Sequence, residues 1–343
     1  MTMGSSTALV AKVRGRFGKY LNPIQLRNMV QETDTAGVLR CIRAIVGSDA
    51  GPFDDVVSCE RELESWKRRR NAELLHFLDT KERDFIQSFL VQDELLELQR
   101  FLRVLQRQNR EEQMSFVLHS IYANTLNLTT DTTVDVAAYL ATLQDKAYYR
   151  LLEPMVLNDT KAKDLNFDTL SVNSARWYYH RLREEAKSFS GNRAKVLNDF
   201  LGVMIDLRNL TRIFHVKKFV PQEDAFLQLQ MIDGGKSIHG KELDTLVAQP
   251  LAMFLEQMEK TPYHALFEGG EVGYSFLPIA TQRYLYHFCQ RIFRTTGDGL
   301  LAALCFIVML QGRMAEIRRI LEAKSLGLKE EQMIQYLIEW RTE

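Results

Sequence analysis

The chain has 343 residues, of which 46% are hydrophobic, and at roughly 150 residues per domain this length suggests two or three units. Its 44 lysines and arginines balance 44 aspartates and glutamates, so the field of the whole molecule gives no argument for nucleic-acid binding. The four cysteines have no CxxC spacing and the N-terminus has no secretory pattern, so we expect a cytosolic protein with reduced thiols and no zinc site.

The low proline content and the apolar spacing predict an almost entirely helical protein. Only 7 prolines occur in 343 residues, and apolar residues recur three and four positions apart. Asn22 and the proline after it predict the start of a helix that extends through Val30. Asp34 or Thr33 is expected to cap the next helix, toward Ile42.

Four polar, turn-rich stretches predict the connections between helices. They are Asn127–Thr133, Gln230–Gly240, Glu268–Gly273 and Thr295–Gly299. Within the second stretch, Gly234-Gly235-Lys236-Ser237 is similar to the end of a phosphate-binding loop. Because the first glycine of that motif is missing and no apolar strand precedes it, we predict a turn.

The C-terminal part is the most apolar. Leu300–Leu310 is a run of 11 uncharged residues, whereas a membrane-spanning helix needs about 20, so we predict a buried core helix. Gly327 is expected to end this helix. The run Leu328–Trp340 is expected to form an amphipathic helix with one apolar face, made of Met333, Ile334, Leu337 and Ile338.

A short pattern occurs three times at a nearly constant period. Each copy has the order acidic, apolar, polar, polar, apolar near the end of a long apolar-periodic helix, and the copies begin at Glu97, Asp206 and Glu316. The acidic positions lie 109 and then 110 residues apart. This period predicts three related helical repeats, which we place at residues 8–110, 111–219 and 220–343. A shallow solenoid would give the same spacing.

Several segments carry a resemblance to a known family. Residues 232–235, 261–266 and 316–328 follow its pattern in order, residues 206–210 look like its acidic-x-x-Asn-Leu motif, and residues 13–16 are similar to its N-terminal segment. On these motifs the chain resembles the C/d family of V-type and A-type rotary ATPases, the socket-forming part of the central stalk. The match in order and length covers most of the chain.

The resemblance implies an all-α fold of three related subdomains, arranged as a pseudo-threefold funnel. In that family the base of the funnel sits on the membrane ring of proteolipid (c/K) subunits, and its cavity receives the rotor shaft, which is made of the D and F subunits. The resemblance therefore implies a monomeric, peripheral, non-catalytic subunit on the cytoplasmic face of the membrane. Such a subunit transmits torque for ATP hydrolysis or synthesis coupled to H⁺ or Na⁺ transport, and it has no cofactor or metal.

Two basic clusters are candidates for contact with the ring or with anionic lipid. They contain Arg14 and Arg16 near the N-terminus, and Arg68 and Arg69 on a later helix. The alternative is a solvated charged face. The repeated acidic residues are expected to have a structural role, as partners of a neighbouring arginine.

Two other hypotheses stay open. A helical-repeat scaffold of an unrelated complex would keep the period of about 110 residues without binding a rotary ring. A helical enzyme would need a site built from residues distant in sequence. The seven histidines form no HxxxH or HExxH pair, and adjacent carboxylates such as Glu111 and Glu112 point about 100° apart on a helix, so no catalytic constellation is recognised.

Overall fold

The structure, a computed structural model, describes residues 3–19, 22–47, 51–152, 166–220, 224–267 and 277–338. Within these ranges the secondary structure is helical and contains no strand, so the predicted all-α fold class is confirmed. The chain divides into two compact units, Met1–Arg83 with Phe189–Glu343, and Asp84–Ser188. The division into three repeats and the funnel stay predictions.

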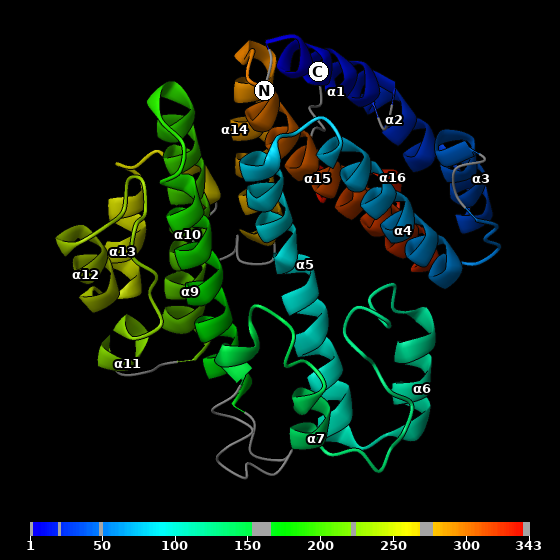
Figure 1. Cartoon of the computed structure of the whole chain (residues 1–343), viewed down its shortest axis with the longest axis horizontal. Helices are drawn as coiled ribbons and strands as arrows, with labels where there is room; N and C mark the ends of the chain where they lie inside the picture. Colours follow the sequence, from blue (N-terminus) through cyan, green and yellow to red (C-terminus); the bar gives the residue numbers. More distant parts are fainter. Residues whose placement is uncertain are drawn as a thin grey trace. The chain divides into compact units, whose positions relative to one another are not determined.

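The first unit contains helices from both ends of the chain, coloured blue to cyan and green to red in Figure 1. The N-terminal helices are α1 (Met3–Lys19), α2 (Pro23–Gln31), α3 (Thr35–Val46) and α4 (Val56–Leu75). The later helices are α10 (Gly191–Phe219), α11 (Asp224–Gln228), α12 (Lys241–Ala248), α13 (Leu251–Met258), the 3-10 helix η3 (His264–Leu266), α14 (Leu277–Thr295), α15 (Gly299–Ser325) and α16 (Glu330–Ile334). Helix α15 packs against α1, α4 and α14.

Predicted helix caps account for the first turns of this unit. The Asn22 side chain accepts a hydrogen bond from the Gln25 amide at 3.0 Å, and this capping box confirms the predicted start of α2. Asp34, rather than Thr33, caps α3, because its carboxylate accepts from the Gly37 amide at 2.8 Å. Both caps act within one turn of the chain, so a local pattern is enough to predict them.

The second unit is built on the continuation of a long helix. Helix α5 (Thr80–Arg107) enters this unit at residue 84, and the unit then adds α6 (Arg110–His119), α7 (Val136–Ala141) and α9 (Phe167–Ala186). The ring of Phe101 on α5 packs against Tyr139 of α7 at 4.9 Å between centroids. Tyr178 of α9 is buried and donates a hydrogen bond to the Phe89 carbonyl at 3.0 Å, so aromatic residues of α9 belong to the core.

The apolar run Leu300–Leu310 lies in the first half of α15, and all eleven of its side chains are buried. Among the described residues, α15 is the one helix long and apolar enough to cross a membrane, with a mean hydropathy of 1.7 in its most apolar window. However, 83% of that window is buried inside the protein. The predicted core helix is therefore confirmed.

The chain leaves α15 at the predicted glycine, and the helix after it is shorter than expected. Gly327 has φ +68°, in the left-handed region that favours glycine, and it follows the last turn of α15. The expected helix Leu328–Trp340 was wrong in length, because α16 ends at Ile334. Beyond it, the Ile338 amide donates to Glu316, and Arg283 donates to the carbonyls of Leu337 and Ile338. Its last residues, including Trp340, lie outside the described ranges.

The connections at Asn127–Thr133, Gln230–Gly240 and Thr295–Gly299 follow the prediction closely, because each joins or borders helices at a loop. The expected connection Glu268–Gly273 falls outside the part of the chain that the structure describes. The connections between helices were therefore more predictable than the segment that follows α15.

One ion triad joins the starts of the three longest helices, α5, α10 and α15, which have 28, 29 and 27 residues. Arg193 on α10 lies with Nη1 2.8 Å from Glu82 Oε1 and with Nε 2.6 Å from Asp298 Oδ2. Glu82 belongs to the capping box of α5, and Asp298 caps α15. The three helices start 111 and 108 residues apart, close to the period of the sequence pattern.

We expect the Arg193→Met variant to be destabilised by about 2–3 kcal/mol, because the buried carboxylate of Glu82 would lose its cationic partner. Urea unfolding followed by circular dichroism measures this change. Lys195→Met, which removes the same charge from an exposed position of α10, is the matched control and should unfold like the wild type. Equal stability of the two variants would contradict a role for the triad.

Candidate functional site

Asp206 on α10 is fully buried and holds a loop in place. Its carboxylate accepts hydrogen bonds from the Ser237 amide at 2.7 Å, the Ile238 amide at 3.3 Å and the Tyr263 hydroxyl at 2.6 Å. Burial raises the pKa of Asp206 above its ordinary value, and these donors partly oppose that rise. The acidic residue of the predicted second repeat therefore binds neutral donors instead of an arginine.

Asn209, one turn later on α10, holds the same loop at a second point. Its side-chain amide donates to the Ile232 carbonyl at 2.8 Å, and its side-chain oxygen accepts from the Ile232 amide at 3.0 Å. At Gly235 an added Cβ would lie 1.9 Å from Asp206 Oδ1, so a side chain would collide with the carboxylate. The turn 234–237 thus packs against Asp206. The amides of Ser237 and Ile238 donate to the aspartate, whereas in a phosphate-binding loop such amides would face the phosphate.

Glu316 on α15 holds the C-terminal segment in place, as Asp206 holds its loop. Its carboxylate lies 2.7 Å from Arg313 Nη1 and accepts a hydrogen bond from the Ile338 amide at 2.6 Å. Arg319, at the position that Asn209 has in the second repeat, donates to the Tyr336 carbonyl at 3.3 Å. Both glutamate and arginine therefore hold the chain where it returns against α15.

Glu97 on α5 lies in the second unit and makes a similar contact. Its carboxylate accepts a hydrogen bond from the Ser120 hydroxyl at 2.5 Å and lies 3.5 Å from Arg100 Nη1. Each of the three acidic side chains thus binds a residue that lies between 22 and 57 positions later in the chain. Glu97 and Glu316 also lie within salt-bridge distance of an arginine three residues away.

The N-terminal arginines that we considered for ring or lipid contact bind the protein itself. Arg14 Nη2 donates to the carbonyls of Phe293, Arg294 and Thr296, at 3.1, 3.2 and 2.9 Å, and so caps the end of α14. Arg16 forms an ion pair with Glu73 on α4. These contacts attach α1 to the rest of the first unit.

The other two candidate arginines lie on α4. Arg69 is exposed, and its Nη1 donates to the Ser65 hydroxyl at 2.8 Å, while Arg68 is half-buried. Their hydrogen bond and their exposure do not show whether these two arginines contact a ring or lipid. That role stays a prediction.

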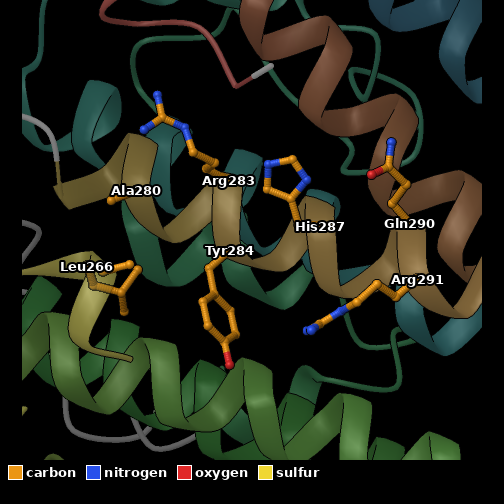
Figure 2. Close-up of a pocket in the computed structure, with 8 residues that line it drawn as sticks. Leu266, Ala280, Arg283, Tyr284, His287, Gln290 and Arg291 are labelled. Atoms are coloured by element: carbon orange, nitrogen blue, oxygen red, sulfur yellow. The ribbon is translucent and has the colours of Figure 1, made fainter. Parts of the chain in front are cut away.

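A half-open pocket of about 510 Å³ lies along α14 in the first unit. Figure 2 shows Arg283, His287 and Gln290 on one side of this helix, and Tyr284 on the other. Burial raises the pKa of Tyr284 above its ordinary value. The lining side chains described include no carboxylate; they are Ala265, Leu266, Ala280, Arg283, Tyr284, His287, Gln290 and Arg291.

Metal-ligand chemistry has little support in the described ranges. No group of three or more histidine, cysteine, aspartate or glutamate side chains there could hold a metal ion. Of the four thiols, Cys59, Cys289 and Cys305 are buried and Cys41 is half-buried. The carboxylates described above bind arginines, hydroxyls and backbone amides.

Sequence reasoning missed the Arg193 triad and the pocket on α14. A sequence signal for the triad existed at the helix starts. Asp79 and Asp298 are both residues of a type that caps helices, and they are separated by roughly twice the period of the acidic pattern. The pocket lining also follows a helical pattern, because its α14 residues recur three and four positions apart. Neither pattern indicates which distant residues complete the site.

The chain matches a protein-family model described as ATP synthase (C/AC39) subunit over residues 9–336. It is also similar to the C subunit of the A-type ATP synthase of Methanococcoides burtonii, with 28% identity over 88 residues. This alignment covers 26% of the chain and 24% of the relative, so the chain spans about a quarter of the length of the curated relative that it matches.

We expect Asp206→Ala to destabilise the first unit by about 3 kcal/mol, because two backbone amides and the Tyr263 hydroxyl would lose their acceptor. Trypsin should also cleave faster at Lys236, in the released loop. The control is Asp199→Ala, which removes a half-exposed partner of Lys236 on the same helix and should cost less than about 1 kcal/mol. Equal urea midpoints for the two variants would refute the role assigned to Asp206.

Proposed function

Because the chain belongs to the ATP synthase (C/AC39) subunit family, we propose that it is the central-stalk subunit of a V-type or A-type rotary ATPase. This membership confirms the resemblance found in the sequence motifs. In the proposed role the chain is a socket between the rotor shaft, made of the D and F subunits, and the membrane ring of proteolipid (c/K) subunits. It transmits torque between ATP hydrolysis or synthesis and H⁺ or Na⁺ transport and catalyses no reaction itself.

The observation that carries the proposal is the extent of the family match. Residues 9–336 include nearly the whole of both compact units, so the match is not confined to one motif or one helix. The repeated acidic pattern and the three long helices with nearly equal spacing support the same assignment.

The internal contacts fit a part that transmits force. A torque-transmitting subunit must resist bending, and long helices do so when their ends and sides are fixed to neighbours. The Arg193 triad fixes the starts of the long helices, and Asp206 and Glu316 fix the loops that return against α10 and α15. These charged side chains bind other parts of the same chain, and this arrangement supports a mechanical role better than a catalytic one.

Within this proposal, the ring or lipid contact is assigned first to Arg68 and Arg69 on α4. Arg14 and Arg16 bind α14 and α4, whereas Arg69 donates a hydrogen bond to Ser65 on its own helix. Arg69 is exposed, so its guanidinium can reach an anionic headgroup or an acidic loop at the surface. The chain is then a peripheral, monomeric component on the cytoplasmic face of the membrane.

The first test is affinity purification of the tagged chain from detergent-solubilised membranes of its native host, with mass spectrometry of the bound proteins. We expect the shaft subunits, the proteolipid and the catalytic head subunits to co-purify. Recovery of the chain alone, or with unrelated soluble proteins, would contradict the proposal and favour a scaffold of another complex.

A second test concerns the contact on α4. The double variant Arg68→Glu, Arg69→Glu should recover several-fold less proteolipid than the wild type, because it replaces two cations that face anionic groups in the proposal. Lys260→Glu, at an exposed position of the same unit, should recover a normal amount. The melting temperature of each purified variant verifies that it is folded. Normal recovery by the folded double variant would exclude this contact.

A further inference from the structure

The pocket on α14 forms a basic groove with an apolar end, and the proposed function assigns it no partner. Three of its side chains, Arg283, His287 and Arg291, are cationic or can become so. Leu266 of η3 and Ala280 of α14 provide the apolar end. The lining side chains that the structure describes include no carboxylate, so the charged side chains that line the groove are cationic.

One of the two arginines is held in position by the protein. Arg283 donates through Nε to the Ile338 carbonyl at 3.1 Å and through Nη2 to the Leu337 carbonyl at 2.7 Å. Burial lowers the pKa of nearby Arg319; the charge of Glu316 opposes this shift, and the charge of Arg283 adds to it. These two hydrogen bonds preorganise the guanidinium of Arg283.

Arg291 is the exposed cation of the groove. Its guanidinium carbon lies 6.0 Å from the centre of the Phe288 ring, and its charge opposes the rise in the pKa of Tyr284. An exposed arginine beside a half-buried tyrosine offers both a charge and a flat aromatic surface to a ligand. Arg291 is thus the side chain whose replacement changes the groove most directly.

The spacing of the charges indicates the size of the ligand. Arg283 and Arg291 are eight residues apart, so their Cα atoms are separated by about 12 Å along the helix axis. In Figure 2 the Arg283 side chain extends away from the side of α14 on which Tyr284 lies. One small oxyanion is too short to bind both guanidinium groups, whereas a chain with several carboxylates can reach each of them.

We propose that this groove docks an acidic peptide segment of a partner protein, with its carboxylates on Arg283 and Arg291 and an apolar side chain against Leu266 and Ala280. The charge of the groove selects the partner, and the length of the α14 face selects a peptide over a small anion. This inference does not depend on the rotary role, since it concerns recognition by the purified chain.

The test is fluorescence anisotropy of the full chain with a labelled glutamate-alanine-leucine peptide of about 12 residues, long enough to span this face of α14. We expect saturable binding that weakens as salt is added, and no binding of a peptide with lysine in place of glutamate. Arg291→Glu should weaken the affinity by about tenfold, which corresponds to about 1.4 kcal/mol.

The matched control is Arg294→Glu, which reverses the same charge at an exposed position of α14 outside the groove. It should bind the peptide as the wild type does, and thermal unfolding of both variants verifies their folding. Equal binding by the two variants, or no binding of the acidic peptide, would overturn the proposal. Competition by inorganic phosphate at the affinity of the peptide would instead identify a small-anion site and also overturn it.

Discussion

The arrangement of the first unit depends on one cation, Arg193, placed between two carboxylates at the starts of long helices. Glu82 is fully buried, and an unpaired buried carboxylate would be costly, so the helix that carries Glu82 must stay beside the helix that carries Arg193. Asp298 applies the same constraint to α15, whose apolar half forms the core. Burial raises the pKa of Glu82, which is consistent with a carboxylate that lacks water and relies on its partner.

Carboxylates also hold the loops that follow the long helices, and these carboxylates belong to the acidic pattern of the sequence. Glu97, Asp206 and Glu316 each use a carboxylate to bind a segment that returns against a long helix. The chemistry of the partner varies between a hydroxyl, backbone amides and an arginine, so what the three sequence patterns share is the position of the acceptor. A framework fixed at helix starts and at returning loops suits the proposed role, in which the subunit must carry torque without a catalytic centre.

Local patterns predicted much of this fold, because helix caps and apolar runs act within one or two turns. Asn22 and Asp34 cap their helices, and Leu300–Leu310 is buried, as the sequence alone indicated. The helix expected up to Trp340 was too long, because contacts from Glu316 and α14 hold its backbone. For the same reason the sequence could not show that Arg14 binds carbonyls some 280 residues away, or that Arg283 and Arg291 would line one groove on α14.

The most direct test of the central claim is ATP-driven ion uptake by membrane vesicles from a host that lacks the chain, measured together with ATP hydrolysis. We expect hydrolysis without ion uptake in these vesicles, and recovery of uptake when the purified chain is added back. ATP-driven uptake at the wild-type rate in its absence would contradict the proposed coupling role.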